Sequence, residues 1–539
     1  MSVRNFLKQN RIFSILSTGF CTWIVFLVIL SITNQRKIIF LDALDSVLGT
    51  DVSSEYSLTI PLIRYFIEPL AGIAFIIGKD FEYLIAFTII YLAYRIVYLY
   101  LKKRGRVDAE KFKKLKHPAY NFMTFVFKTF SSAVVIIGVI ILIGYLIIGY
   151  YFVSRYFMVL VQTIIRICFV LLIIKFSYFI IILLHPKMHF RHFPKKKQIR
   201  NKTYSRSSKH YVNVKMELIY IVGIICLMLG FNIVLISTPF PTQTINANLD
   251  SDEFLFDFHV HTTMSDGWLT PEQRVMWYIE QGIHGAAFTD HDNIRGAIIA
   301  RNYVENNNLN FVVWIGAEWT DNENDIHMNY YGLQEEIVAP LSETPLGTTL
   351  ALNASEMITY VKSRGGYVTV NHYNYNSNPH GGFGTPYTLE QLRDWGVDGF
   401  EIVNGDHIET NEIREFCLNN TNSYNESMIC FGGSDVHTSQ ELNAFVKLRL
   451  EDPTNKTIAN IFKNLRSNNH SVITVDLHSN LVDFPKMLNA LGFKLLEDYL
   501  NYLLNLDSIQ ILSWIIWSTI GYGLMLLTYK KLKKQIIKK

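Results

Sequence analysis

Residues 254–267 read FLFDFHVHTTMSDG. Within this β-rich run, His259 and His261 stand two residues apart. On a strand the side chains at i and i+2 point to the same face, so both imidazoles can reach one metal ion. Asp257 lies two residues upstream and is predicted to accept a hydrogen bond from a ligand imidazole. The stretch therefore predicts a strand that leads into a metal site.

Short β-rich runs alternate with amphipathic helical stretches from Glu253 onward. The predicted strands are 254–261, 285–291, 310–319, 327–333, 367–372, 399–404, 428–433 and 471–475. Helix starts are readable at Thr270-Pro271 and at Asn353. This alternation predicts an α/β fold with a mostly parallel sheet, and about seven repeats suffice to close a barrel.

Metal-binding residue types recur where these strands end. The residues concerned are His259, His261, Asp290, His291, Glu318, His372, Asp435 and His437. The carboxyl ends of barrel strands form one face, so we expect these side chains to converge there. The glycines at 432 and 433 would let the backbone come close to that site. The donors are nitrogen and carboxylate without thiolate, which suits Zn, Mn or Fe.

Four motifs in this order, HxH, TDH, GxE and SDxH, carry a family resemblance. Residues 253–478 resemble the PHP (polymerase and histidinol phosphatase) superfamily of metal-dependent hydrolases. Within it they are most similar to the nucleotide phosphoesterase and carbaryl-hydrolase-like branches. The resemblance implies a distorted (β/α)7 barrel holding two or three divalent metal ions.

The resemblance also implies ligand sets. One metal would take His259, His261, Glu318 and Asp435, a second Glu318, His327 and His372, and a third Asp266, His291 and His437. Catalysis is expected to depend on Asp435, Glu318 and His437. Asp257 and Asp290 are expected to hydrogen-bond to the metal ligands without binding the metal themselves. Arg295 and Arg364 are candidates for binding a substrate phosphate.

Half of the residues are hydrophobic, and apolar runs long enough to cross a bilayer precede and follow this domain. The runs lie near 12–32, 82–101, 121–150, 156–184, 216–237 and 508–528, whereas 57–77 carries charges and prolines that favour an interfacial segment. We therefore predict a transmembrane region of five or six spans over 1–237, an all-α part of the fold. This region is followed by a linker at 238–252, the PHP-like domain at 253–478, a connecting helix at 479–507, a last span at 508–528 and a basic tail at 529–539.

Charge predicts the orientation. Residues 245–480 hold 32 acidic and 12 basic residues, a net −20, so the remainder of this +4 chain carries +24. The bases collect at 102–116, at 187–215 and in the tail, which the positive-inside rule places in the cytoplasm. We therefore expect a multi-pass membrane protein in the lipid bilayer, with its PHP-like domain on the non-cytoplasmic side and its C-terminal tail in the cytoplasm.

The predicted function is a membrane-anchored phosphoesterase that hydrolyses a small phosphorylated compound through a metal-activated hydroxide. The alternatives are a metallohydrolase of a carbamate, ester or amide, and a nonenzymatic metal-stabilised sensor. The net charge of −20 would repel a long nucleic acid, so none is expected as a partner. Five cysteines exclude a disulfide framework, although one bridge between Cys417 and Cys430 is possible.

Overall fold

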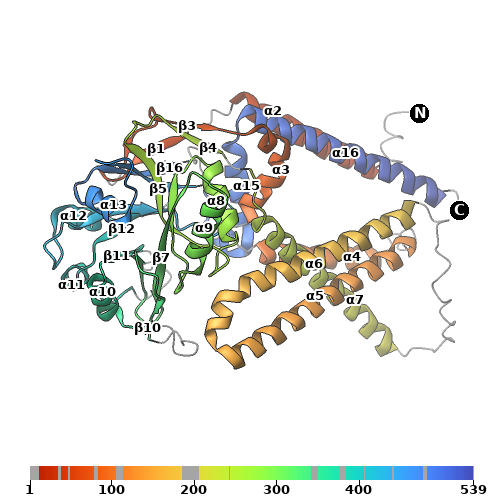
Figure 1. The fold of residues 1–539 in the computed structure, drawn as a ribbon. Helices are drawn as coiled ribbons and strands as arrows, with labels where there is room; N and C mark the ends of the chain where they lie inside the picture. Colours follow the sequence, from red (N-terminus) through yellow and green to blue (C-terminus); the bar gives the residue numbers. More distant parts are fainter. Residues whose placement is uncertain are drawn as a thin grey trace.

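The computed structural model describes residues 11–33, 38–45, 49–77, 83–104, 113–184, 206–241, 243–340, 350–374, 384–405, 407–439, 442–476 and 482–537. Most of the predicted basic segments, at 102–116, at 187–215 and in the tail, lie outside these residues or in helices whose side chains are not described. A β-rich domain sits at one end of a bundle of long helices (Figure 1).

The domain is built on a mixed sheet of twelve strands in the order β13-β12-β11-β8-β7-β6-β5-β15-β16-β1-β2, with β14 paired to β12. Its strands are β1 (Ile39–Asp42), β2 (Thr50–Asp51), β5 (Glu253–Val260), β6 (Gly285–Phe288), β7 (Val312–Asp321), β8 (Ile326–Tyr331), β11 (Tyr367–Val370), β12 (Gly399–Asn404), β13 (His407–Ile408), β14 (Ile429–Gly433), β15 (Ala444–Arg449) and β16 (His470–Asp476). All eight predicted strands are present. The sheet as a whole is not mostly parallel, because antiparallel strands extend it beyond β5.

Seven strands, β5-β6-β7-β8-β11-β12-β14, come close to forming a ring. The chain beyond β14 runs beside the end of β5, where Asp435 N donates to His259 O at 2.9 Å and Val260 forms a parallel bridge with Val436. This contact is an isolated bridge rather than a ladder. The structure thus agrees with the expected α/β architecture, while the closed (β/α)7 barrel remains a prediction.

One strand of the ring runs against the others. β7 and β8 form an antiparallel hairpin, whose turn includes Asp325 at φ 49°. The start of β8 therefore lies at the same edge as the carboxyl ends of β5, β6, β7, β11, β12 and β14. That reversal places His327, near the start of β8, beside Glu318, near the end of β7.

The β domain also takes in residues that the sequence assigned to the membrane region and to the linker, the latter in a separate two-stranded sheet. β1 pairs with β16, Ile39 opposite Asp476, and β3 (Tyr56–Thr59) pairs with β4 (Thr244–Ala247). Phe40 and Tyr56 are buried in the domain core. A segment about 200 residues upstream thus completes the edge of the domain.

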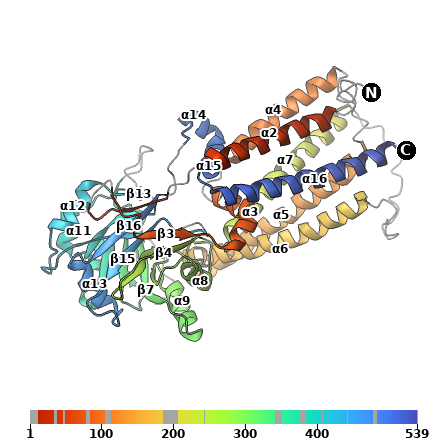
Figure 2. The same ribbon diagram turned by 90° about the horizontal axis from the view of Figure 1, so that it is seen from above.

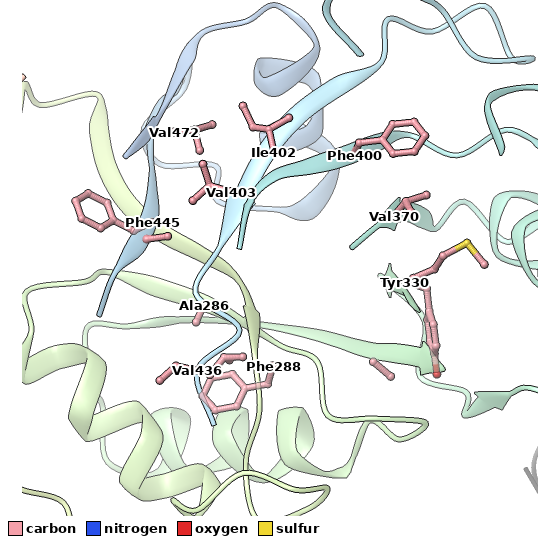
Figure 3. Packing of buried hydrophobic residues seen from close by; sticks show 14 of the residues in the cluster. Ala286, Phe288, Tyr330, Val370, Phe400, Ile402, Val403, Val436, Phe445 and Val472 are labelled. Carbon is pink, nitrogen blue, oxygen red and sulfur yellow. The ribbon is translucent and has the colours of Figure 1, made fainter. Parts of the chain in front are cut away.

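Apolar side chains from all parts of the sheet form the core, as Figure 3 shows for Phe288, Tyr330, Phe400 and Phe445. A second cluster is rich in aromatic rings from β5, β7, β8, β14 and the helix α13 (Ile458–Arg466). Large buried side chains fix the strands in register, because cores are packed as densely as crystals. The strand ends, and the site they carry, are consequently held on a rigid frame.

Short helices connect the strands. They are α8 (Pro271–Glu280), α9 (Arg295–Asn306), α10 (Ala354–Ser363), α11 (Leu389–Trp395), α12 (Asn411–Asn419) and α13 (Ile458–Arg466), and a small sheet pairs β9 (Ile337–Val338) with β10 (Leu350–Ala351). The predicted starts at Thr270 and Asn353 are confirmed, each as a capping box in which the cap side chain accepts a bond from the N3 backbone. A disulfide joins Cys417 of α12 to Cys430 of β14, the one pairing that the sequence left open.

The remaining helices form the bundle (Figure 2). They are α2 (Arg11–Thr33), α3 (Leu62–Ile77), α4 (Tyr83–Lys103), α5 (Lys113–Ile148), α6 (Tyr150–Leu184), α7 (Arg206–Ile236) and α16 (Ser508–Ile537). Three short helical segments come directly before α16 in the chain, namely α14 (Lys486–Leu488), the π-helix η1 (Asn489–Phe493) and α15 (Lys494–Leu504). Among the described residues, six of these helices are long and apolar enough to cross a membrane, namely α2, α4, α5, α6, α7 and α16. The first and last of them pack together through Trp23 Nε1, which donates to Ser518 Oγ at 2.9 Å.

Candidate metal centre

All nine predicted ligand residues lie together at one edge of the sheet. Glu318 is at their centre, 1% exposed, and its two oxygens face the ring nitrogens of five histidines. The nitrogen-to-oxygen distances are 3.4 Å for His259, 3.2 Å for His261, 3.0 Å for His291, 3.1 Å for His327 and 3.4 Å for His372. One buried carboxylate thus gathers five imidazoles from four separate segments of the chain.

The HxH pair faces a second carboxylate. His259 Nε2 and His261 Nε2 lie 3.1 Å apart, and Asp435 Oδ1 is 3.4 Å from the former and 3.0 Å from the latter. Both imidazoles are fully buried. Three potential ligand atoms therefore converge on one point, as the i, i+2 spacing predicts.

A further group lies at the more exposed edge of the cluster. His437 Nε2 lies 3.2 Å from Asp266 Oδ2, while His261 and His291 approach the same carboxylate at 3.6 and 3.7 Å. The ligand atoms of these four residues lie within 4.8 Å of one another, as do those of His291, Glu318 and His327. His291 thus joins the group expected to hold the second metal. His372 contacts that group through Glu318 at 3.4 Å and through the ring of His327, with ring centroids 4.9 Å apart.

The ligand atoms of the cluster are better suited to coordinating divalent ions than to forming hydrogen bonds with one another. Glu318 Oε2 and Asp435 Oδ1 are buried and have no hydrogen-bond donor in acceptable geometry, although ring nitrogens face them at about 3 Å. Buried carboxylate oxygens without a donor are costly unless a cation compensates them. The residues present therefore suit divalent metal ions bound by nitrogen and oxygen.

The electrostatics of the cluster point the same way. Burial opposes charge on His259, yet the carboxylates of Asp435, Glu318 and Glu401 raise its pKa well above the ordinary value. Burial likewise opposes ionisation of Glu318, but the surrounding imidazoles hold its pKa well below normal. Against the effect of burial, Asp266 and Asp435 raise the pKa of His437 to about 9. Protons and divalent cations will thus compete for the same nitrogens.

The backbone is unusual at two of the site residues. His372 and Asp435 have φ angles of 27° and 48°, in the left-handed region that L-residues seldom adopt. Gly433 is also required, because a Cβ there would lie 2.4 Å from His259 Cβ. The sequence prediction that glycine lets the backbone approach the site is confirmed at this position.

Sequence reasoning missed Glu401, which is fully buried on β12. Its Oε1 lies 3.1 Å from His259 Nδ1, and its Oε2 accepts hydrogen bonds from His372 N and Asn404 Nδ2, both at 3.0 Å. The prediction that Asp257 bonds a ligand imidazole is wrong. Asp257 instead accepts from Tyr278 OH at 2.6 Å and from Ser434 N at 2.9 Å, so it ties α8 and the chain beyond β14 to β5.

Asp290 supports the loop after the HxH pair rather than an imidazole. It accepts hydrogen bonds from Thr262 N at 2.7 Å and from Ser265 Oγ at 2.8 Å. Ser265 Oγ in turn lies 3.4 Å from His261 Nδ1. Asp290 thus acts on the predicted ligand through one intervening hydroxyl.

The two arginines proposed for phosphate binding contact other groups. Arg295 donates to Tyr156 OH on α6 at 2.9 Å, and Arg364 is 55% exposed and lies 3.6 Å from Glu335. A third arginine, Arg274 on α8, is fully buried and donates to Val436 O at 3.2 Å, between Asp435 and His437. No motif in the sequence marks Arg274 as a site residue. Only the fold places it next to the backbone between Asp435 and His437.

Residues 257–393 match the family described as PHP domain, so this part of the chain is a PHP domain. The match ends before Glu401, Asp435 and His437. Over 94 residues, 17% of the chain, it is 36% identical to the phosphoribosyl 1,2-cyclic phosphate 1,2-diphosphodiesterase of Eggerthella lenta. Over 91 residues, 16% of the chain, it is 36% identical to the 5'-3' exoribonuclease Rnm of Escherichia coli.

The chain spans about a third of the length of these curated relatives, 36% and 30% respectively. Among solved structures it is similar to a two-domain protein from Bacteroides vulgatus that contains a predicted PHP-like metal-dependent phosphoesterase. The identity is 20% and the TM-score 0.34, with 46% of this chain and 71% of the other covered.

Proposed function

We propose that the chain is a membrane-anchored, metal-dependent phosphoesterase that acts on a small phosphorylated substrate. The observation that carries the proposal is Glu318, a single buried carboxylate faced by five imidazoles within 3.4 Å. The names of the two curated relatives, a cyclic phosphate diesterase and an exoribonuclease, support phosphoester hydrolysis.

Hydrolysis adds water across a P–O bond, so the departing alcohol oxygen must take up one proton. A divalent ion bound in the cluster would act as a Lewis acid and would lower the pKa of a coordinated water towards neutrality. Glu318 and Asp435 orient the histidine nitrogens around a common point. His437 and Asp266 lie at the accessible edge, with side chains 31% and 52% exposed, where they can exchange the proton.

The arrangement of the helices supports the proposed topology. α2 begins, and α16 ends, at the end of the bundle remote from the β domain (Figures 1 and 2). The predicted basic segments adjoin helix ends at this same remote end of the bundle. The positive-inside rule places that end in the cytoplasm and would therefore leave the domain outside it. The disulfide between Cys417 and Cys430 is consistent with an oxidising compartment.

A carbamate, ester or amide hydrolase is the second candidate. It is favoured by one observation, that the Arg364 guanidinium is 55% exposed and lies 3.6 Å from Glu335. Phosphate substrates usually need such a cationic clamp in addition to metals.

The test uses the full-length protein purified in detergent. Metal content is measured together with hydrolysis of a phosphomonoester, a phosphodiester and a carboxylic ester, for the wild type and for His259→Ala and Asp435→Ala. His407→Ala is the matched control, because His407 is an exposed histidine outside the cluster.

We expect metal-dependent phosphate release that both site variants abolish and the control retains. Turnover of the carboxylic ester alone would replace the proposal with the second candidate. Bound metal without turnover of any ester would instead favour a nonenzymatic sensor.

A further inference from the structure

Polar side chains of α6 hold the loops of the metal centre. α5 and α6 form a helical hairpin that turns at Gly149. Near the start of α6, Arg155 lies 2.7 Å from Glu336 Oε1 and donates to Asp292 O at 3.0 Å. Two turns further on, Gln162 Nε2 donates to Trp268 O at 3.1 Å.

Two of the residues that α6 contacts lie next to predicted ligands in the sequence. Asp292 follows His291 directly, and Trp268 lies two residues after Asp266. Trp268 N also donates to His437 O at 2.6 Å. The hairpin is therefore fixed against the loops that carry three ligands.

The same edge is where the cluster is accessible. The side chains of Asp266, His437 and His291 are 52%, 31% and 25% exposed, whereas those of His259 and Glu318 are at most 1% exposed. His327 and Asp435 are 21% and 20% exposed, so this edge is the most exposed part of the cluster, and a substrate that enters there passes the loops that α6 holds.

We define the hairpin tip as residues 142–157. It exposes large apolar side chains, 57% at Leu142, 51% at Ile143, 73% at Leu146, 72% at Ile147 and 43% at Phe157. The apolar stretches of α5 and α6 are 29 and 30 residues long, about ten more than a helix needs to cross a bilayer. An apolar surface thus continues from the membrane helices to the accessible edge of the metal centre.

Charge also argues against delivery from bulk water. The acidic part of the chain, residues 245–480, carries a net −20, which repels dissolved anions. Where the hairpin tip meets the domain, Arg295 donates to Tyr156 OH at 2.9 Å, whereas Arg155 is 3% exposed and already paired with Glu336. An anion that moves along the bilayer surface would meet this point first.

We infer that the substrate is a phosphorylated lipid, whose phosphate enters at the edge formed by Asp266 and His437 while its hydrocarbon stays against the hairpin tip. This inference rests on the proposed function. Hydrolysis would consume one water, break the P–O ester bond and leave the phosphate in solution or on the lipid, according to which ester bond is cut.

The experiment compares substrates with the same headgroup with and without acyl chains. The full-length protein in lipid nanodiscs is given phosphatidic acid against glycerol 3-phosphate, and phosphatidylglycerol against glycerophosphoglycerol. Because the acyl chains hold the lipid beside the site, we expect kcat/KM to be about a hundredfold higher for the diacyl member of one pair.

A hairpin variant tests the surface itself. With Leu146→Glu and Ile147→Glu together, the ratio of diacyl to short-chain kcat/KM should fall at least about tenfold, because charge in the tip disfavours hydrocarbon. Leu146→Ala with Ile147→Ala should lower the ratio by a smaller factor. Tyr424→Glu, at a residue 49% exposed on the domain, is the control and should leave the ratio unchanged.

A binding readout does not depend on turnover. Fluorescence anisotropy with a diacyl phosphonate that cannot be hydrolysed should give a Kd that rises in the glutamate variant and stays constant in the control. An unchanged Kd and an unchanged kcat/KM ratio in that variant would overturn the assignment to the hairpin tip.

The remaining outcomes separate the two proposals. Equal kcat/KM within both pairs, with phosphate release still lost in His259→Ala, would overturn the lipid substrate and leave the phosphoesterase standing. No release from any phosphoester would overturn the proposed function, and the lipid inference with it.

Discussion

His259 Nδ1 lies 3.1 Å from Glu401 Oε1, and both side chains are fully buried. The same carboxylate accepts a hydrogen bond from His372 N, so it fixes two predicted ligands on different strands. With Nδ1 turned to Glu401, the Nε2 atom of His259 faces Glu318 and Asp435. Such an outer carboxylate sets the tautomer and orientation of a ligand imidazole.

Glu401→Gln should weaken metal binding about 10- to 100-fold, because a neutral amide holds the His259 ring less firmly and lowers its basicity. Competition of the full-length protein with a chelator measures the affinity. Glu412→Gln makes the same chemical change on the exposed face of α12 and serves as the control. Equal affinities for the two variants would contradict the role given to Glu401.

Phe40→Ala should destabilise the β domain, although Phe40 lies far upstream of it in the chain. The side chain is 2% exposed and stacks on Tyr56, with ring centroids 4.8 Å apart. Removing a buried Phe costs about 3–5 kcal/mol. Thermal unfolding of the full-length protein measures the loss, and Tyr424→Ala is the exposed aromatic control.

A fragment of residues 245–480 lacks β1, so β16 keeps only β15 as a neighbour and becomes an edge strand. We expect it to unfold at a lower temperature than the domain does in the full chain. A midpoint equal to that of the full chain would show that β1 adds nothing to the stability of the domain.

Opening the disulfide should lower the free energy of unfolding by about 3 kcal/mol, since Cys417 and Cys430 close a loop of similar length to the 15-residue reference case. Cys417→Ser combined with Cys430→Ser is compared with the wild type in urea. Cys21→Ser, at an exposed cysteine of α2, is the control. Peptide mapping without a reductant checks the bridge, and recovery of both thiols free would refute it.

His470 should make the domain sensitive to acid. Burial lowers its pKa to about 4, and its Nε2 lies 2.7 Å from Cys430 O while Nδ1 has no partner among the described residues. Between about pH 6.5 and 4 the unfolded chain binds a proton at this residue that the folded chain does not. Stability is therefore present above the unfolded pKa and is lost as the pH falls through this window, by about 3 kcal/mol.

The measurement is the free energy of unfolding from pH 7 to pH 4 for the wild type and for His470→Gln. The variant should lose less stability on acidification than the wild type, even if it is less stable at pH 7. His407→Gln, at an exposed histidine, should follow the wild type. Parallel pH profiles for wild type and His470→Gln would exclude the effect.

Local patterns predicted the strands and most of the cluster, whereas Asp266 and His327 were assigned as ligands only through the family resemblance. The i, i+2 spacing of His259 and His261 fixes a common face whatever surrounds it. Motifs at strand ends, such as Glu318 and His291, share an edge once the strands run parallel. These predictions held because side-chain alternation and strand polarity are properties of the segment itself.

Long-range pairing decided the rest. Glu401 reads as one acid inside a strand, and only the neighbouring strands make it the partner of His259. β1 joins the sheet through β16, more than 400 residues away, and no local signal specifies such a pairing. Arg155 lies in an apolar helix, and its contact with Asp292 exists only because the hairpin is packed against the domain.

The sequence by itself therefore determined the type of domain, the residue types gathered at its candidate site and the helices able to cross a membrane. The tertiary structure alone decided which carboxylate supports the imidazoles, which upstream strand completes the sheet and where the long apolar helices contact the site. The physical reason is that spacing and hydropathy act within a segment, whereas hydrogen bonds and burial between distant segments depend on how the whole chain packs.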